Sequence, residues 1–152
     1  MPAPYLGRCL CDTVQYRLNG EPLTVYACHC TDCQKRSGSA FGLSMWVRRA
    51  DIVVAKGEAA TLEVTGVDGK PRHHRTCAKC GTRLWSERPD RLEIAVLRPG
   101  TLEDTKWLRP VAHLWTRSAQ PWFTFPRGVT RFETQPDDLK ELVVLWQQRG
   151  NQ

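Results

Sequence analysis

The chain has 152 residues, of which 41% are hydrophobic, 25% are charged and 9% are aromatic, and its formal net charge is +6. This composition excludes wholesale disorder, collagen and a low-complexity tail, and the length predicts one domain that spans residues 1–152. The longest apolar runs, such as residues 142–146, are far shorter than the roughly 18 residues of a membrane helix. The N-terminal segment lacks the apolar stretch of a signal peptide, so we expect a cytoplasmic protein without a membrane partner.

Most of the predicted elements are strands. Residues 13–18 alternate apolar and polar side chains with the period of two that is typical of a half-buried strand. Further strands are predicted at 25–28, 43–48, 52–56, 61–65, 72–77, 82–87, 92–97 and 113–116. A turn at 66–70 would join its two neighbouring strands into a hairpin that leads to Cys77.

Two segments are predicted to be helical. Residues 31–36 fit one short turn of helix, capped by Thr31 or Asp32 and ended near Gly38. A full helix is predicted only at the C-terminus, over about residues 137–149. Asp137 or Asp138 can cap it, and Leu139, Leu142, Val143 and Trp146 recur at helical spacing. We expect this helix to pack on the sheet.

Seven cysteines form three groups with the spacings CxC, CxCxxC and CxxC. The groups are Cys9 and Cys11; Cys28, Cys30 and Cys33; and Cys77 and Cys80. An odd count without a signal peptide argues against a disulfide framework. The grouping therefore favours metal binding over free structural thiols or redox chemistry.

The first and last groups predict a closed four-thiolate zinc site. Cys9 and Cys11 lie two residues apart, so in an extended segment both side chains face the same way. Cys77 and Cys80 flank a tight turn, and Gly81 tolerates a positive φ directly after it. Since 65 residues separate the two pairs, we expect this ion to be structural and to pin the first strand to a mid-chain hairpin.

The middle group supplies three thiolates within six residues, at Cys28, Cys30 and Cys33. Three protein ligands leave one position of a tetrahedral zinc ion for water or substrate, which is typical of catalytic sites. The alternative is a second structural site, completed by a carboxylate or by one of His29, His73, His74 and His113.

Four segments carry a resemblance to a known family: GRCLCDTVQYRL at 7–18, ACHCTDCQKRSGSAF at 27–41, CAKCGTRLW at 77–85 and PVAHLWTRSAQPW at 110–122. Over about residues 5–133 the chain resembles the glutathione-dependent formaldehyde-activating enzymes, also called the centromere protein V-like family. The resemblance implies a mainly β fold, the β-tent, built from antiparallel strands that zinc holds together.

The resemblance also implies a zinc-dependent carbon–sulfur lyase. The best-known activity of the family is the reversible condensation of formaldehyde with glutathione to S-hydroxymethylglutathione. By position, Cys9, Cys11, Cys77 and Cys80 match the ligands of the structural zinc ion, whereas Cys28, Cys30 and Cys33 match those of the catalytic ion. The implied cofactors are two Zn²⁺ ions, and the implied partners are a glutathione-like thiol and an aldehyde.

The chemistry of three thiolates suits this reaction. A zinc ion with three thiolate ligands carries a formal charge of about −1, so it is a weaker Lewis acid than a histidine-bound ion and favours a soft sulfur ligand. We hypothesise that a substrate thiol takes the fourth position, loses its proton and attacks an aldehyde carbonyl.

Candidate substrate contacts flank the middle cysteines. Lys35 and Arg36 are placed to receive a carboxylate of a glutathione-like substrate, unless they are simply a solvated surface. His113 is a candidate proton donor to the developing alkoxide, or else a core histidine. Trp115, Trp122 and Phe123 are candidates for a pocket wall or for the core. We expect the substrate over residues 28–38, with 109–122 as the opposite wall.

Two other functions compete with the lyase. A non-catalytic zinc-stabilised module would bind nucleic acid or protein through basic residues near the last cysteine pair, namely Arg72, Arg75, Lys79 and Arg83. Interspersed acidic residues and the lack of a base-stacking motif argue against a nucleic-acid partner. A thiol redox protein would instead use Cys30 and Cys33.

Overall fold

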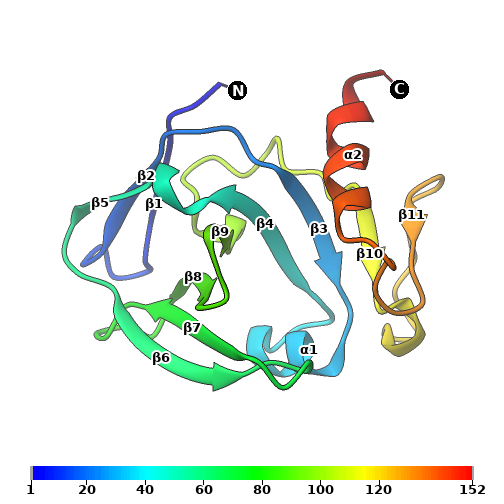
Figure 1. Cartoon of the computed structure of the whole chain (residues 1–152), viewed down its shortest axis with the longest axis horizontal. Coiled ribbons are helices and arrows are strands. Elements are labelled where there is room, and N and C mark those ends of the chain that lie inside the picture. The colour runs from blue at the N-terminus through cyan, green and yellow to red at the C-terminus, as the bar shows by residue number, and fades with distance from the viewer. Residues whose placement is uncertain (1, 152) are drawn as a thin grey trace. The chain divides into compact units, whose positions relative to one another are not determined.

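The computed structural model describes residues 2–151, and the expected mainly β fold with a C-terminal helix is confirmed (Figure 1). The strands are β1 Tyr5–Arg8, β2 Gln15–Leu18, β3 Thr24–Cys28, β4 Gly42–Arg48, β5 Ile52–Lys56, β6 Ala60–Thr65, β7 Pro71–Thr76, β8 Arg83–Arg88, β9 Arg91–Leu97, β10 Ala112–Leu114 and β11 Thr130–Arg131. The helices are α1 Thr31–Ser37 and α2 Lys140–Gln148. In the described part of the chain, neither helix is long and apolar enough to cross a membrane.

The chain forms two compact units, and each unit is built from two separate stretches of sequence. The first unit contains the residues up to Pro22 together with Met45–Trp107. The second unit contains Leu23–Ser44 together with the residues from Leu108 onward. Neither unit is a contiguous half of the chain, and the single domain over residues 1–152 stays a prediction.

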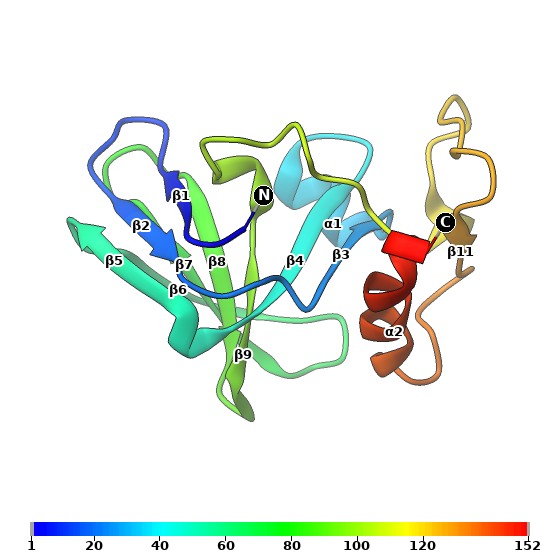
Figure 2. The same cartoon turned by 90° about the horizontal axis from the view of Figure 1, so that it is seen from above.

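The first unit contains antiparallel strands around a hydrophobic core. Strands β1, β2 and β5 pair in that order (Figure 2). Strands β4, β9, β8, β7 and β6 pair in a second series. The side chains of Tyr16, Leu18, Met45 and Trp85 are almost fully buried because alternate residues of these strands face inward.

The predicted hairpin before the last cysteine pair is confirmed. β6 pairs with β7 from Ala60 and Thr76 to Thr65 and Pro71. In the turn, the Gly66 N–H donates to the carbonyl of Lys70 at 2.8 Å, and Gly69 has a φ of 74°. The positive φ explains why a glycine stands at that position.

The second unit departs from the expected antiparallel arrangement. β10 runs parallel to β3, with His113 opposite Ala27 and Leu114 opposite Cys28, and it also runs parallel to β11. Strand β10 ends at Leu114, earlier than predicted, because Trp115 adopts a left-handed conformation with a φ of 57°.

The C-terminal helix packs on β3 as expected. The Thr24 hydroxyl donates to the carbonyl of Leu142 at 2.8 Å, and Leu142 and Trp146 are buried. The predicted cap is wrong: the helix begins at Lys140 with Leu139 in the N-cap position. Asp138 still accepts a hydrogen bond from the Lys140 N–H at 2.9 Å, so it satisfies one free donor of the first turn.

Candidate metal centres

Cys9, Cys11, Cys77 and Cys80 converge in the first unit, and their four sulfur atoms all lie within 4.8 Å of one another. The Sγ atoms of Cys9 and Cys11, and those of Cys11 and Cys77, are 3.7 Å apart. Zinc–sulfur bonds of about 2.3 Å place the corners of a tetrahedron about 3.8 Å apart. The four-cysteine cluster therefore has the donor set and the spacing that zinc requires.

The two cysteine pairs use the same local backbone structure. The residue after each second cysteine has a positive φ, which is 67° at Asp12 and 76° at Gly81. In the later pair, the Gly81 N–H donates to the Cys77 carbonyl at 2.8 Å, as expected for a tight turn. In the earlier pair, the Val14 N–H donates to Cys9 Sγ at 3.3 Å, and such N–H groups stabilise a thiolate.

Each pair also presents a threonine hydroxyl to a cysteine, which the sequence analysis missed. Thr13 Oγ1 lies 3.1 Å from Cys11 Sγ, and Thr82 Oγ1 lies 3.1 Å from Cys80 Sγ. Hydrogen bonding by Thr82 lowers the pKa of Cys80 to about 5, and Thr13 likewise lowers the pKa of Cys11. The repeated pattern of cysteine, left-handed residue and threonine, CDT and CGT, was the available signal.

Thr82 also ties the two pairs together. Its hydroxyl oxygen accepts a hydrogen bond from the Leu10 N–H at 3.2 Å, across 72 positions of the sequence. The Leu10 N–H occupies a lone pair of Thr82 Oγ1, so the hydroxyl hydrogen of Thr82 remains available to donate to Cys80 Sγ.

We expect Gly81→Ala to destabilise the first unit by about 1–2 kcal/mol, because a Cβ is disfavoured at positive φ. Nothing lies within 4 Å of the added Cβ, so the effect is one of backbone conformation alone. Denaturant unfolding of zinc-loaded protein measures it. The control is Gly100→Ala, which also meets open space but lacks a positive φ, and an equal loss in both variants would contradict the interpretation.

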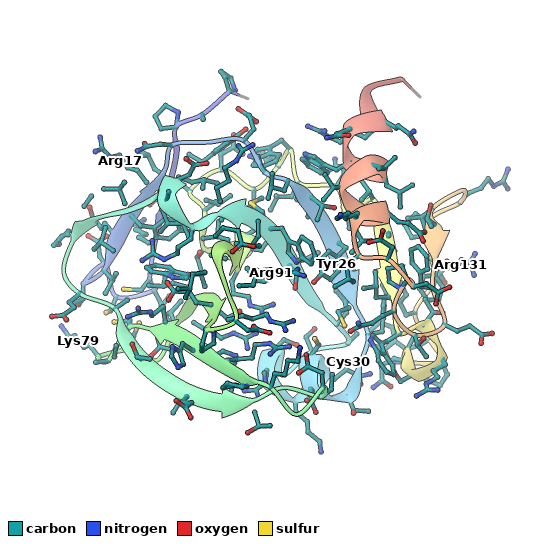
Figure 3. All side chains as sticks on the ribbon, viewed as in Figure 1. Arg17, Tyr26, Cys30, Lys79, Arg91 and Arg131 are labelled. Atoms are coloured by element: carbon teal, nitrogen blue, oxygen red, sulfur yellow. The ribbon has the colours of Figure 1, made fainter. Side chains whose placement is uncertain are left out.

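Cys28, Cys30 and Cys33 form a second cluster, whose three sulfur atoms also lie within 4.8 Å of one another. Cys28 ends β3, Cys30 precedes α1 and Cys33 lies in its first turn; Figure 3 labels Cys30 among the side chains. Among the described residues, no histidine or carboxylate joins these sulfurs at that spacing. This favours three protein ligands over the alternative of a completed structural site.

The predicted caps of the short helix are partly wrong. Its N-cap is Cys30, whose Sγ accepts the Cys33 N–H at 3.2 Å, rather than Thr31 or Asp32. At the other end, Gly38 is in the C-cap position with a φ of 64°, as expected. The cap places a cysteine sulfur where free N–H groups stabilise negative charge.

Two of the three thiols, Cys28 and Cys30, have pKa values shifted in opposite directions. Hydrogen bonds from the Cys28 and Cys33 side chains, together with backbone N–H groups of α1, lower the pKa of Cys30. The same thiol interactions, together with burial, raise the pKa of Cys28. The Cys33 N–H at the start of α1 therefore favours negative charge on the Cys30 sulfur.

The three-cysteine cluster is buried on one side and more open on the other. Cys28 and Cys30 are 8% and 9% exposed, and they pack with Ala112, Leu114 and Leu142. Cys33 is only partly buried. A ligand would approach the cluster from the side of Cys33.

His113 lies on the other face of β10. It alternates with Ala112 and Leu114, which face the cysteines, so its ring points to the opposite side of the strand. There its Nδ1 lies 2.8 Å from Nε2 of His29. Burial lowers the pKa of His113 to about 4 and also lowers the pKa of His29, so both rings are neutral near pH 7.

The remaining predicted contacts are scattered. Lys35 and Arg36 are exposed in the last turn of α1, where positive charge also complements the helix dipole. Trp122 is 72% exposed and is not part of the core. Phe123 instead packs against His29, with ring centroids 4.9 Å apart.

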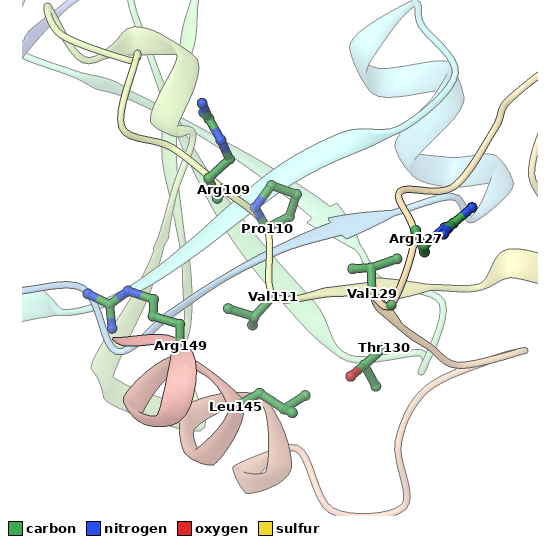
Figure 4. Close-up of a pocket in the computed structure, with 9 residues that line it drawn as sticks. Arg109, Pro110, Val111, Arg127, Val129, Thr130, Leu145 and Arg149 are labelled. Carbon is green, nitrogen blue, oxygen red and sulfur yellow. The ribbon is translucent and has the colours of Figure 1, made fainter. Parts of the chain in front are cut away.

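A pocket of about 230 Å³ lies in the second unit, between the segment before β10, the segment before β11 and α2 (Figure 4). Its floor is apolar and includes Val111, Val129 and Leu145, while Arg109, Arg127 and Arg149 lie around it. The three guanidinium groups extend away from the apolar residues between them. Of the predicted substrate wall, only residues 109–111 line this pocket.

Two of the four basic residues predicted near the last cysteine pair, Arg72 and Arg75, are paired with acids. Arg72 contacts Asp68 at 2.8 Å, and Arg75 contacts Glu87 at 3.2 Å. Glu87 also accepts a hydrogen bond from the indole N–H of Trp85 at 2.9 Å. These ion pairs reduce the positive charge that a nucleic-acid surface would need.

Comparisons with known proteins agree with the cysteine pattern. The sequence model of the family described as glutathione-dependent formaldehyde-activating enzyme matches residues 4–118. No curated protein matches the chain. A solved crystal structure of a Rhodobacter sphaeroides protein is similar, with 21% identity and a TM-score of 0.52, covering 67% of this chain and 91% of that one, which supports the fold alone. Since the family match spans most of the sequence and includes every cysteine, the chain belongs to the glutathione-dependent formaldehyde-activating enzyme family.

Proposed function

We propose that the chain is a zinc-dependent carbon–sulfur lyase that reversibly joins a small-molecule thiol to an aldehyde in the cytoplasm. Glutathione and formaldehyde, which give S-hydroxymethylglutathione, are the substrates that the family match supports. The observation that carries the proposal is the cluster of Cys28, Cys30 and Cys33, because three convergent thiols leave one position of a tetrahedral ion open. The four-cysteine cluster is proposed to hold a second, structural ion.

The reaction needs no oxidant and no further reactant. The thiolate sulfur forms a bond to the carbonyl carbon, and the π electrons of the carbonyl move to its oxygen. That oxygen takes up the proton that the thiol released, so the atoms and charges balance. In the reverse direction the carbon–sulfur bond breaks, and the aldehyde and thiol are regenerated.

The residues of the second unit prepare the site for this step. A zinc ion held by the three cysteines would lower the pKa of a thiol in its fourth position and so favour the nucleophilic thiolate. Cys28 and Cys30 are buried among apolar side chains, which exclude water from that side. The N–H groups at the start of α1 stabilise the charge of Cys30.

His113 is not assigned the role of proton donor in this proposal. Its ring points away from the face of β10 that packs on the cysteines, and it is hydrogen-bonded to His29. This position supports the alternative of a buried core histidine.

Lys35→Ala combined with Arg36→Ala is expected to raise KM several-fold and to leave kcat within about twofold. A carboxylate of the thiol substrate would contact these side chains equally in the ground and transition states. Initial rates at varied thiol concentration measure both constants. Lys140→Ala, on the exposed start of α2, is the control, and an unchanged KM in the double variant would reject this placement of the carboxylate.

Exchange NMR tests the proposed function directly. Glutathione and formaldehyde are mixed at equilibrium, and the rate of interconversion with S-hydroxymethylglutathione is measured with and without the zinc-loaded protein. We expect faster interconversion that is lost after chelation and restored by zinc. Equal rates for the loaded and chelated protein would reject the proposal for this substrate pair.

A further inference from the structure

His29 and His113 form a buried pair on the face of β3 and β10 that points away from the cysteines. Their relative exposures are 0% and 2%, and Nε2 of His29 lies 2.8 Å from Nδ1 of His113. Three phenylalanines surround the ring of His29, with centroid distances of 5.2 Å to Phe41, 4.9 Å to Phe123 and 5.3 Å to Phe125. The hydrogen bond is therefore buried among aromatic rings.

The pair is not explained by its contribution to folding. A neutral imidazole has one N–H and one lone pair, so only one hydrogen lies in the bond between two rings. The two outer nitrogens, Nδ1 of His29 and Nε2 of His113, are buried and have no hydrogen-bond partner among residues 2–151, which the structure describes. Since unpartnered buried polar atoms are unfavourable, an apolar pair of similar shape would be at least as stable.

The pair can instead orient the cysteine sulfurs, because His29 lies between two cysteines of the cluster. His29 separates Cys28 from Cys30, so its ring and their sulfur atoms point to opposite sides of the chain. The hydrogen bond to His113 holds the ring of His29 in place. It therefore also fixes the backbone of residues 28–30, which carries the sulfur atoms of Cys28 and Cys30.

The backbone of His29 is held as firmly as its ring. Its N–H donates to the Leu114 carbonyl at 2.9 Å. Its carbonyl accepts two hydrogen bonds, from Gln34 Nε2 at 2.8 Å and from Ser118 Oγ at 2.9 Å. Gln34 belongs to α1, so this carbonyl also positions the helix that carries Cys33.

We propose that the His29–His113 pair is a positioning device that sets the geometry of the three-cysteine cluster and thereby its affinity for zinc. His29 and His113 are positioning residues and touch neither the ion nor the substrate in this role. The inference rests on the proposed function only in that the cluster must bind zinc. Groups beyond the first ligands of a metal typically change its affinity by about 10–100-fold.

The test compares His113→Leu, which removes the hydrogen bond, with His113→Asn, whose amide can reach the position of Nδ1 and restore it. Zinc affinity of each cluster is measured by competition with a chelator, and stability by thermal melting of the zinc-loaded protein. For His113→Leu we expect about 10-fold weaker binding at the three-cysteine cluster and unchanged binding at the four-cysteine cluster. Since His113→Leu leaves Nε2 of His29 without a partner, stability is compared on the double variant His29→Leu and His113→Leu, which should melt no lower than the wild type. His113→Asn should recover most of the affinity.

A purely structural role would lower the melting temperature of the double variant together with the affinity, and His113→Asn would not restore the affinity selectively. His73→Leu, a partly exposed histidine of β7, is the control and should change neither affinity. If His113→Leu fails to fold, Ser118→Ala is used instead. It removes the hydrogen bond from Ser118 Oγ to the His29 carbonyl, which also holds His29 in place, and it should weaken zinc binding several-fold. Affinities within twofold of the wild type in the Leu or Ser118→Ala variant overturn the inference, whereas a wild-type protein that binds one zinc ion overturns the proposed function and the inference with it.

Discussion

Cys77→Ser is expected to unfold the first unit or to cause aggregation. Cys77 is 1% exposed, and its sulfur lies 3.7 Å from Cys11 in a cluster that joins segments separated by 65 residues. A structural zinc ion contributes on the order of 10 kcal/mol of apparent folding free energy at pH 7, which exceeds or equals the whole stability of many domains. Metal analysis and thermal melting followed by circular dichroism measure the loss.

Ala78→Ser is the matched control for this substitution. Ala78 is exposed in the same turn, so the added hydroxyl meets water and removes no ligand. The control should keep two zinc ions and the wild-type melting temperature. A Cys77→Ser protein that retained both ions and melted with the control would contradict the structural role of the four-cysteine cluster.

Cys30→Ser is expected to keep the fold while losing one zinc ion and the lyase activity. The three cysteines lie within six residues, so releasing their ion frees little long-range constraint. Serine is also a favourable N-cap, so its hydroxyl can replace the sulfur that accepts the Cys33 N–H at the start of α1. Metal analysis, thermal melting and the exchange assay measure the three outcomes.

The comparison of the two cysteine variants separates an enzyme from a binding module. Thr31→Ser, in the exposed first position of α1, is the control and should retain both ions and the activity. If Cys30→Ser melts as early as Cys77→Ser, both ions are structural. The division into a structural and a catalytic site then fails, and the non-catalytic module becomes the better explanation.

The sequence predicted those features that depend on neighbouring residues. The cysteine groups, the hairpin at 61–76 and the positive φ of Gly81 follow from spacing and from local backbone preferences, and all are present. The short strands β1 and β11 were missed because four and two residues are too few to show a period. The CDT pattern was missed because aspartate rarely signals a left-handed residue as clearly as glycine does.

The sequence could not predict which residues far apart in the chain lie next to each other in the fold. His29 and His113 stand 84 positions apart, and they meet only because β10 lies parallel to β3. The alternation of side chains along each strand was predictable, but the face that each side chain occupies depends on that pairing. For the same reason, the sequence analysis proposed His113 as a proton donor at the three-cysteine cluster, whereas its neighbours Ala112 and Leu114 pack there instead.

Cobalt substitution tests the central claim, which is that the cluster of Cys28, Cys30 and Cys33 has an open coordination position for a thiol. Cobalt(II) is loaded into both clusters of the wild-type protein and into the four-cysteine cluster that Cys30→Ser retains, and the sulfur-to-cobalt charge-transfer absorption is followed while glutathione is added. We predict that the absorption of the wild type rises by about one sulfur ligand per protein and saturates, and that Cys30→Ser gives no such rise. A wild-type spectrum that corresponds to the seven cysteine sulfurs and does not change with glutathione would contradict the account.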